Sequence, residues 1–124
     1  MKLNPDCLRD ILLYIEETTD LDNALVFEPN NLPQNLCNYD SQEVMYHIKQ
    51  AQLSNLIVLQ SWFISGSCLI KYLSPEGHQF VGNIKSDNVW QKVKEISKTM
   101  GASSVTLLAQ IASNVALAVI KSHL

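Results

Sequence analysis

Three histidines are the side chains of this sequence best suited to acid–base chemistry or metal binding. His47, His78 and His123 are far apart, and the sequence has no His-x-x-x-His, Glu-x-x-His or paired-carboxylate motif. Pairs of catalytic or metal-ligating residues on a helix use such spacings, because residues three or four apart share one face. His47 stands beside the apolar Ile48 and is typical of a histidine held inside a core. We therefore expect no enzyme, no metal site and no cofactor.

The cysteines and the apolar runs indicate a compartment. Cys7, Cys37 and Cys68 are odd in number and include no Cys-x-x-Cys pair, which argues against a disulfide framework and a zinc site. The N-terminus lacks the apolar core of a signal peptide. The stretch from Val105 to Ile120 contains four polar residues, whereas a membrane-spanning helix needs ~20 predominantly apolar ones. We expect a cytoplasmic protein with buried or incidental thiols and no membrane contact.

Charge is sparse and unevenly distributed. The chain has 124 residues, a net charge of −3 and 17% charged residues, and this balance argues against a strongly basic nucleic-acid binder. Residues 1–43 hold nine acidic and two basic residues, a net charge of −7, whereas residues 44–124 hold seven lysines and three acidic residues, a net charge of +4. The sequence therefore predicts an acidic front and a mildly basic back.

The elements that position these residues begin with a helix, a short strand and a second helix. Asn4-Pro5 is a good helix start, and the apolar spacing predicts a helix to about Glu17. Leu25–Phe27 is a short strand, followed by a loop with one helical turn. Asp40 and Glu43 form a D-x-x-E variant of the capping box and predict a helix over residues 41–54. Asn55 is expected to end this helix in a left-handed conformation.

A hairpin and three further helices complete the predicted order. The apolar runs 56–64 and 68–73 flank the turn Ser65-Gly66-Ser67, as in a β-hairpin. Ser74-Pro75 starts the next helix, and Asp87 is expected to cap another that ends near Gly101. The last helix is predicted from about Ser103 to His123.

This order of elements is that of a winged helix, in which a helix-turn-helix precedes a β-hairpin wing. The segment 72–80, YLSPEGHQF, resembles the LTPEGHEF stretch after the wing in many such domains, and EVMYHI at 43–48 resembles an EEVLYHI helix. Together with the opening MKLNPDCLRDILLYIEE and with DNVWQK at 87–92, they make the chain resemble an uncharacterised family of phages and prophages of Gram-positive bacteria, domain of unknown function 2513.

The resemblance implies an α+β fold and a biological setting. Residues 1–86 are expected to form a winged helix-turn-helix domain with a β-hairpin wing. Residues 87–124 are expected to form a C-terminal helical extension that packs on this domain or dimerises. The protein is then expected to be a non-enzymatic accessory protein in the cytoplasm of a bacterial host. The family implies no known activity, so we infer the function from the surface residues that the sequence predicts.

DNA binding by a winged-helix transcriptional regulator is one role that these surfaces permit. The second helix of a helix-turn-helix enters the major groove, and the wing contacts the flanking backbone. Specific binding neutralises several phosphates, whereas these two elements carry two lysines, so a dimer would be needed. The candidate DNA-reading side chains are Gln42, Tyr46, Lys49, Gln50 and Gln52, and the candidate wing residues are Trp62, Ser65, Gly66, Ser67 and Lys71.

Binding to a host or phage protein is the role that we favour from the sequence. The hairpin is rich in large apolar residues, half of which strand alternation would expose as an interface. A row of acidic side chains could also imitate phosphates and inhibit a host nucleic-acid enzyme or a defence system such as a CRISPR effector. This candidate acidic interface is made of Asp6, Asp10, Glu16, Glu17, Asp20 and Asp22.

The last helix carries a candidate dimer seam. Its apolar residues recur at spacings of three and four, as in a coiled coil. The helix then packs on its own domain or pairs with a twin in a homodimer; a position on a membrane surface is less favoured, because Lys121 is its one basic residue. The seam residues are Val105, Leu108, Ala112, Val115 and Val119.

Overall fold

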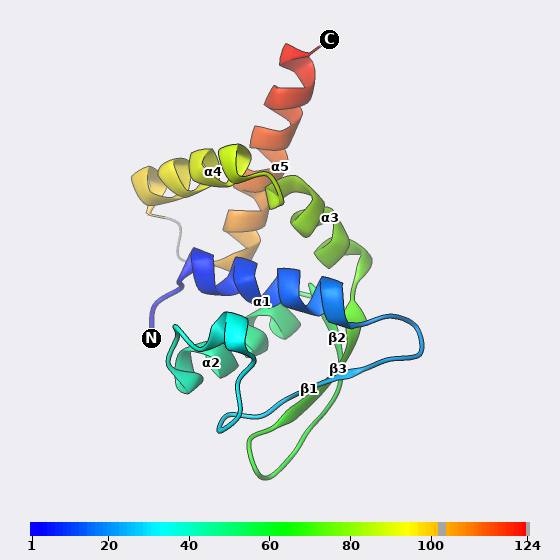
Figure 1. Ribbon diagram of the computed structural model, residues 1–124. Helices are drawn as coiled ribbons and strands as arrows, with labels where there is room; N and C mark the ends of the chain where they lie inside the picture. Colours follow the sequence, from blue (N-terminus) through cyan, green and yellow to red (C-terminus); the bar gives the residue numbers. More distant parts are fainter. Residues whose placement is uncertain (102–103, 124) are drawn as a thin grey trace.

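The computed structural model describes residues 1–101 and 104–123, and over these residues the protein has five α-helices and one three-stranded antiparallel sheet (Figure 1). Helices α1 and α2 lie beside the sheet, whereas α3, α4 and α5 gather on the other side of α1. The predicted α+β class is confirmed. The elements are α1 (Pro5–Thr18), β1 (Leu25–Phe27), a 3-10 turn (Gln34–Leu36), α2 (Ser41–Leu53), β2 (Ile57–Trp62), β3 (Cys68–Leu73), α3 (Pro75–Ile84), α4 (Asp87–Met100) and α5 (Val105–Ser122).

Helix α1 begins as predicted, and hydrogen bonds attach the N-terminal end of α1 to α2. Asn4 is the N-cap, and its side chain accepts a hydrogen bond from the Cys7 N–H at 3.4 Å. The buried His47 of α2 accepts the Asn4 N–H at its Nε2 atom at 2.8 Å, and its Nδ1 lies 2.7 Å from the Glu43 carbonyl oxygen. His47 is therefore a satisfied structural histidine, as predicted.

The predicted capping box at the start of α2 is wrong. Asp40 is the N-cap, but its side chain makes no capping hydrogen bond. Glu43 instead accepts a hydrogen bond from the Asn4 side-chain amide at 3.2 Å. The close approach of the two helix starts gives Glu43 a partner in α1 in place of the N-cap backbone that a capping box would use.

The three strands pair in the order β1-β3-β2, with β3 in the centre. Leu25 pairs with Ile70, and Ile57 pairs with Leu73. Register shifts at Leu59 interrupt the β2–β3 ladder, and β2 ends at Trp62 rather than at the predicted residue 64. The tip Phe63–Ser67 forms the turn that joins β2 to β3.

A tight junction joins α2, the hairpin and α3. Asn55 has φ = 62°, which confirms the predicted left-handed end of α2. Ser74 caps α3: its hydroxyl accepts the Gly77 N–H at 2.9 Å and donates to the Asn55 carbonyl. The Ser74 N–H donates to the Leu56 carbonyl at 3.0 Å. Because α3 packs directly on this carbonyl, a Cβ at Gly77 would lie 1.9 Å from the Leu56 oxygen.

Helices α4 and α5 share one hydrophobic core with residues 1–86. Trp90 and Leu108 lie in the same buried cluster as Leu8 and Ile84. Helix α4 and the first half of α5 therefore pack on the first part of the chain, one of the two expected outcomes for the extension. The N-cap of α4 is Ser86, so the predicted cap at Asp87 is wrong by one residue.

Arg9 and Gly101 fix the two ends of α4. The Arg9 guanidinium donates to the Ile84 and Lys85 carbonyls at 3.0 Å each and to Asp87 at 3.1 Å. These bonds attach the junction between α3 and α4 to α1. Gly101 ends α4 with φ = 67°, as predicted for a left-handed C-terminal position.

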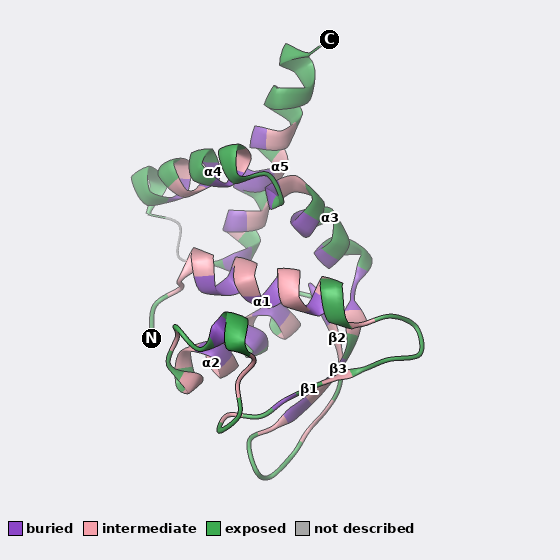
Figure 2. Ribbon diagram, in the orientation of Figure 1, coloured by how far each residue is buried: buried purple, intermediate pink, exposed green. Residues whose placement is uncertain are grey.

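The predicted dimer seam on α5 is wrong for four of its five residues. Val105, Leu108, Ala112 and Val115 are buried in the chain's own core, and Val119 alone is exposed. Figure 2 shows that the C-terminal end of α5 is exposed. A three-four spacing identifies one apolar stripe on a helix but not the surface that covers it. Here α3 and α4 cover the stripe. The predicted start at Ser103 lies outside the described residues.

Helix α5 is also long and apolar enough to cross a membrane, judged by length and composition alone. Its 18 residues have a mean hydropathy of 1.5. A core helix of a water-soluble protein passes the same test, and the buried residues of α5 lie in its first eleven positions. The composition of α5 is therefore weak evidence for a membrane contact.

We expect one of the three thiols to react in the folded protein. Burial raises the pKa of the Cys7 thiol to about 12 and that of Cys68 to about 11, whereas Cys37 is exposed. Because the thiolate is the nucleophile, Ellman's reagent at about pH 8 should titrate Cys37 rapidly, and the other two thiols only after unfolding in denaturant. A Cys37→Ser variant should lose the rapid phase; rapid labelling that persists in this variant would contradict the buried positions of Cys7 and Cys68.

Candidate functional site

The hairpin is attached to α2 through Trp62. The Trp62 indole N–H donates to the Gln52 side-chain oxygen at 2.9 Å, and the Lys49 ammonium lies 5.3 Å from the centre of the Trp62 ring. A cation over an indole face is attracted by the ring quadrupole. Two of the predicted DNA-reading side chains therefore contact the hairpin. They hold α2 and β2 together as one surface.

The other predicted DNA-reading residues differ from one another in solvent exposure. Gln42 is exposed at the start of α2, and Gln50 is half-buried. Tyr46 is also half-buried, and the centre of its ring lies 5.2 Å from that of His47 in an edge-on arrangement. Among the five, only Gln42 and Lys49 are exposed.

The hairpin tip is a short turn that presents apolar side chains. The Phe63 N–H donates to the Ser67 carbonyl at 2.9 Å, and the Gly66 N–H donates to the Phe63 carbonyl at 3.0 Å. Gly66 has φ = 90°, a backbone conformation that favours glycine. The Ser65 hydroxyl donates a hydrogen bond to the Ser67 hydroxyl at 3.2 Å. The turn predicted at Ser65–Ser67 is present, and it contains no cationic side chain.

Large apolar side chains are exposed at the end of α2 and at this tip. Leu53 at the end of α2 is 65% exposed, Phe63 is 47% exposed and Ile64 is fully exposed. We call Lys49, Leu53, Trp62, Phe63 and Ile64 the α2–hairpin surface. Sequence reasoning did not single out Leu53, although it is an apolar residue off the buried stripe of its helix. The surface combines apolar side chains with one cation.

Lys71, the second cation expected to face DNA, lies apart from Lys49. It is exposed on β3 and shares a small pocket of about 270 Å³ with Asp20 and Asp22. The loop after α1 thus places two carboxylates near this lysine. Lys71 therefore does not add to a positive surface on α2.

The predicted acidic interface is partly neutralised within the fold. Asp6 accepts the Trp90 indole N–H at 2.9 Å and forms an ion pair with Lys94 at 3.1 Å. Asp10 accepts the Tyr39 hydroxyl at 2.7 Å; burial, together with this hydrogen bond, raises the pKa of the Tyr39 phenol. These two carboxylates are half-buried and serve the packing of α1.

The remaining acidic residues of that interface also differ in whether they have a partner within the fold. Glu16 pairs with Lys85 at 2.8 Å, and this hydrogen bond raises the pKa of the Lys85 ammonium. Hydrogen bonds from Asn23 and neighbouring backbone lower the pKa of the exposed Asp20 carboxyl. Glu17 and Asp22 are exposed. The six carboxylates therefore do not form a continuous free row, because partners distant in sequence occupy three of them.

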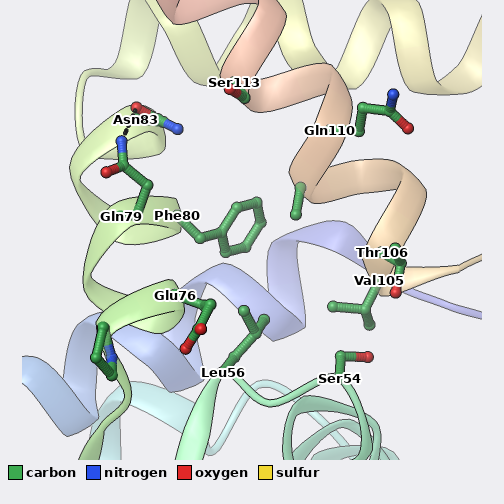
Figure 3. Close-up of a pocket in the computed structure, with 12 residues that line it drawn as sticks. Ser54, Leu56, Glu76, Gln79, Phe80, Asn83, Val105, Thr106, Gln110 and Ser113 are labelled. Carbon is green, nitrogen blue, oxygen red and sulfur yellow. Dashed lines mark hydrogen bonds between the residues drawn. The ribbon is translucent and has the colours of Figure 1, made fainter.

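A second concave site lies between α3 and α5 (Figure 3). Its volume is about 540 Å³, and Phe80 points into it from α3 while Leu56 and Val105 line it from the junction and α5. Gln79 donates to the Asn83 side-chain oxygen at 3.3 Å on its rim. The other lining residues are Ser54, Pro75, Glu76, Thr106, Ala109, Gln110 and Ser113.

The lining of this pocket is apolar and polar with a single carboxylate among the described residues. Among the described residues that line it, Glu76 is the one ionisable side chain. Its amides and hydroxyls are hydrogen-bonding groups, and a lone carboxylate without a base, acid or nucleophile beside it lacks the pairs that acid–base catalysis uses. Over residues 1–101 and 104–123, no cluster of three metal-binding side chains is present.

The geometry defines a class: a mixed α+β protein of five helices and a small antiparallel sheet that presents an apolar surface on α2 and the hairpin. Comparison with known proteins gives the family. A family model described as "Hypothetical protein (DUF2513)" matches residues 2–103, and the chain belongs to this family. An uncharacterized protein of Haemophilus influenzae is 30% identical over 118 residues, which cover 93% of this chain and 95% of that protein. No solved structure matches the chain significantly.

Proposed function

We propose that the protein is a non-enzymatic binding module of phage or prophage origin that acts in the bacterial cytoplasm. We propose further that it binds a protein partner through the α2–hairpin surface. The observation that carries this proposal is the composition of that surface: three exposed large apolar side chains, Leu53, Phe63 and Ile64, beside one exposed lysine.

A winged helix is the fold that we propose for residues 1–86. The succession α1, β1, α2, β2 and β3 supports it, as does the strand order β1-β3-β2 with a hairpin at the end. In such a fold α2 is the helix that would face DNA, and the hairpin is the wing. The attachment of Trp62 to Gln52 supports a hairpin that works as one unit with α2.

Protein binding is favoured over DNA binding by charge and apolar area. Affinity for DNA comes largely from cations that neutralise phosphates, and Lys49 is the one cation of this surface. Protein interfaces, in contrast, depend on a few large side chains that become fully desolvated. Phe63 and Ile64, held on a short turn, are side chains of that type.

Inhibition of a host nucleic-acid enzyme, such as a CRISPR effector, is one function that the proposed protein-binding role includes. The contact is better supported on the α2–hairpin surface than on the acidic side chains of α1. Lysines already neutralise Asp6 and Glu16, and Asp10 binds Tyr39. A partner that displaced these groups would have to break contacts that also hold the fold.

The alternative is a winged-helix DNA-binding transcriptional regulator. Gln42 and Lys49 support it, because both are exposed on the helix that would enter the major groove. Glutamine can read adenine in a bidentate manner, and the lysine can contact a phosphate. A regulator of this kind would need two copies to bind with useful affinity.

The proposal is tested by photo-crosslinking from the hairpin tip. A photoreactive amino acid at Ile64 should give a discrete protein adduct in an extract of the bacterial host, and nuclease should not remove it. Phe63→Asp in the same molecule should weaken capture about tenfold or more, because a buried aromatic anchor contributes about 2 kcal/mol or more at an interface.

The matched control is Val26→Asp, which changes an exposed apolar residue of β1 outside the α2–hairpin surface and should leave capture intact. Fluorescence polarisation with mixed-sequence duplex DNA tests the alternative. Weak binding with a shallow salt dependence agrees with the proposal. Tight binding that falls steeply with salt, together with a nuclease-sensitive adduct, would replace it with the DNA-binding role.

A further inference from the structure

The second half of α5 extends away from the rest of the molecule (Figure 1). Its last turns are exposed, as Figure 2 shows, although residues 115–120 are all apolar. Leu117 is 52% exposed and Ile120 is 56% exposed, and Val119 and Ala118 are exposed as well. These residues lie on different sides of the helix at 100° per residue. A helix that is apolar on every side is normally buried, so this segment lacks a covering surface.

An apolar groove lies directly beside this segment. It runs between α4 and α5 and has a volume of about 560 Å³. Of the described residues that line it, Lys92 is the one with a charge, and the other polar groups are amides and a hydroxyl that can both donate and accept. The lining residues are Lys92, Ile96, Met100, Leu107, Gln110, Ile111, Asn114, Val115, Ala118, Val119 and Ser122.

We propose that a second copy of this chain occupies the groove and that its occupying segment is the protruding end of α5. The helix end and the groove are adjacent on the same chain. A two-fold arrangement therefore covers both at once, with each α5 end in the partner's groove and no surface left to add a third copy. Apart from Lys92, the described residues that line the groove are uncharged, so self-pairing brings no acidic group against another acidic group.

A membrane is a poorer occupant of this surface. The first half of α5 is fixed in the core, so the free segment of residues 115–122 is about 12 Å long, against a bilayer core of about 30 Å. A helix that lies on a membrane has a Lys/Arg-rich polar face opposite an apolar one. The free segment is instead apolar on every side, with Lys121 as its one charged residue.

The size of the contact sets the expected affinity. A standard interface buries about 800 Å² per partner over some 20–30 residues. The groove and the helix end together comprise about half that number of residues, and so about 400 Å² per chain is expected by the same ratio. An interface of this size is at the low end for specific complexes. The dimer should therefore be reversible and dependent on protein concentration.

Sedimentation equilibrium tests this proposal on the full chain. From about 5 µM to about 500 µM, the weight-average mass should rise from 13.9 kDa towards twice that value. Ala118→Glu on α5 and Met100→Glu on α4 should each keep the mass at 13.9 kDa over this range. Both residues are exposed, so circular dichroism should show unchanged folding.

The control variant is Ile64→Glu, which changes the fully exposed hairpin tip and should dimerise like the wild type. Three results would overturn the proposal: a wild-type mass that stays monomeric, a dimer that Ile64→Glu rather than Ala118→Glu disrupts, and flotation of the wild type with phosphatidylcholine–phosphatidylglycerol vesicles that Ala118→Glu abolishes. The result is independent of the crosslink at Ile64, since the two surfaces share no residue.

Discussion

Replacing Gly77 with alanine should lower the free energy of unfolding by about 3 kcal/mol or more. The added Cβ would lie 1.9 Å from the Leu56 carbonyl oxygen and 2.9 Å from its carbon. Both atoms belong to backbone, so no flexible side chain can move aside. The same carbonyl accepts the Ser74 N–H at 3.0 Å, and the Gly77 N–H donates to the Ser74 hydroxyl. Relief of the clash would therefore disturb the cap of α3 as well as the start of the hairpin.

Gly82 in the same helix provides the matched control. No atom lies within 4 Å of a Cβ built there. Gly82→Ala should raise the free energy of unfolding by about 0.5–1 kcal/mol, because alanine costs less backbone entropy than glycine in a helix interior. Urea unfolding followed by circular dichroism measures both changes. Equal stability of the two variants would show that α3 does not approach Leu56 as closely as described.

Leu108→Asp should unfold the protein or cost about 4 kcal/mol or more. Leu108 is fully buried in the core beneath α5. An aspartate there would place a carboxylate among apolar side chains without a partner, and would also remove the packing of a large residue. The sequence alone placed Leu108 in a candidate dimer seam, where the same substitution would separate a dimer. The structure changes that expectation, because the chain's own core covers Leu108.

Leu117→Asp is the same substitution on the same helix at an exposed position. Its melting temperature at low protein concentration should stay within a few degrees of the wild type, since a surface change is usually worth less than about 0.5 kcal/mol. Thermal melts of the two variants, recorded side by side, make the comparison. A folded, monomeric Leu108→Asp protein with wild-type stability would contradict the core position of α5.

Local patterns predicted most of the secondary structure. Asn4-Pro5 and Ser74-Pro75 mark helix starts because a side-chain oxygen satisfies a backbone N–H a few residues later, and both caps are present. Asn55 and Gly101 adopt positive φ, which these residue types tolerate better than others. These features depend on neighbours in the chain, so the sequence contains the information needed to predict them.

The main predictions that failed were those that depended on a distant partner, whereas the local misses were shifts of one or two residues. The Asp40–Glu43 box did not form because Asn4, 39 residues away from Glu43, took the Glu43 carboxylate. The sequence left open whether the chain's own domain or a twin covers the α5 seam, and α3 and α4 cover most of it. The Trp62–Gln52 contact, which makes α2 and the hairpin one surface, was likewise not visible in the spacing.

The sequence by itself determined the order of elements, several of their caps, the family and the division into an acidic front and a basic back. Only the tertiary structure decided which of these charged side chains pair with one another and which stay free. Lys94 reaches Asp6 and Lys85 reaches Glu16 across 88 and 69 residues, so part of the contrast is neutralised by ion pairs within the chain. Charge along a chain is additive and can be counted, but its exposure depends on which segments fold against each other. The apolar hairpin tip and the end of α5 are exposed in the fold, and they are the surfaces that we propose for partners.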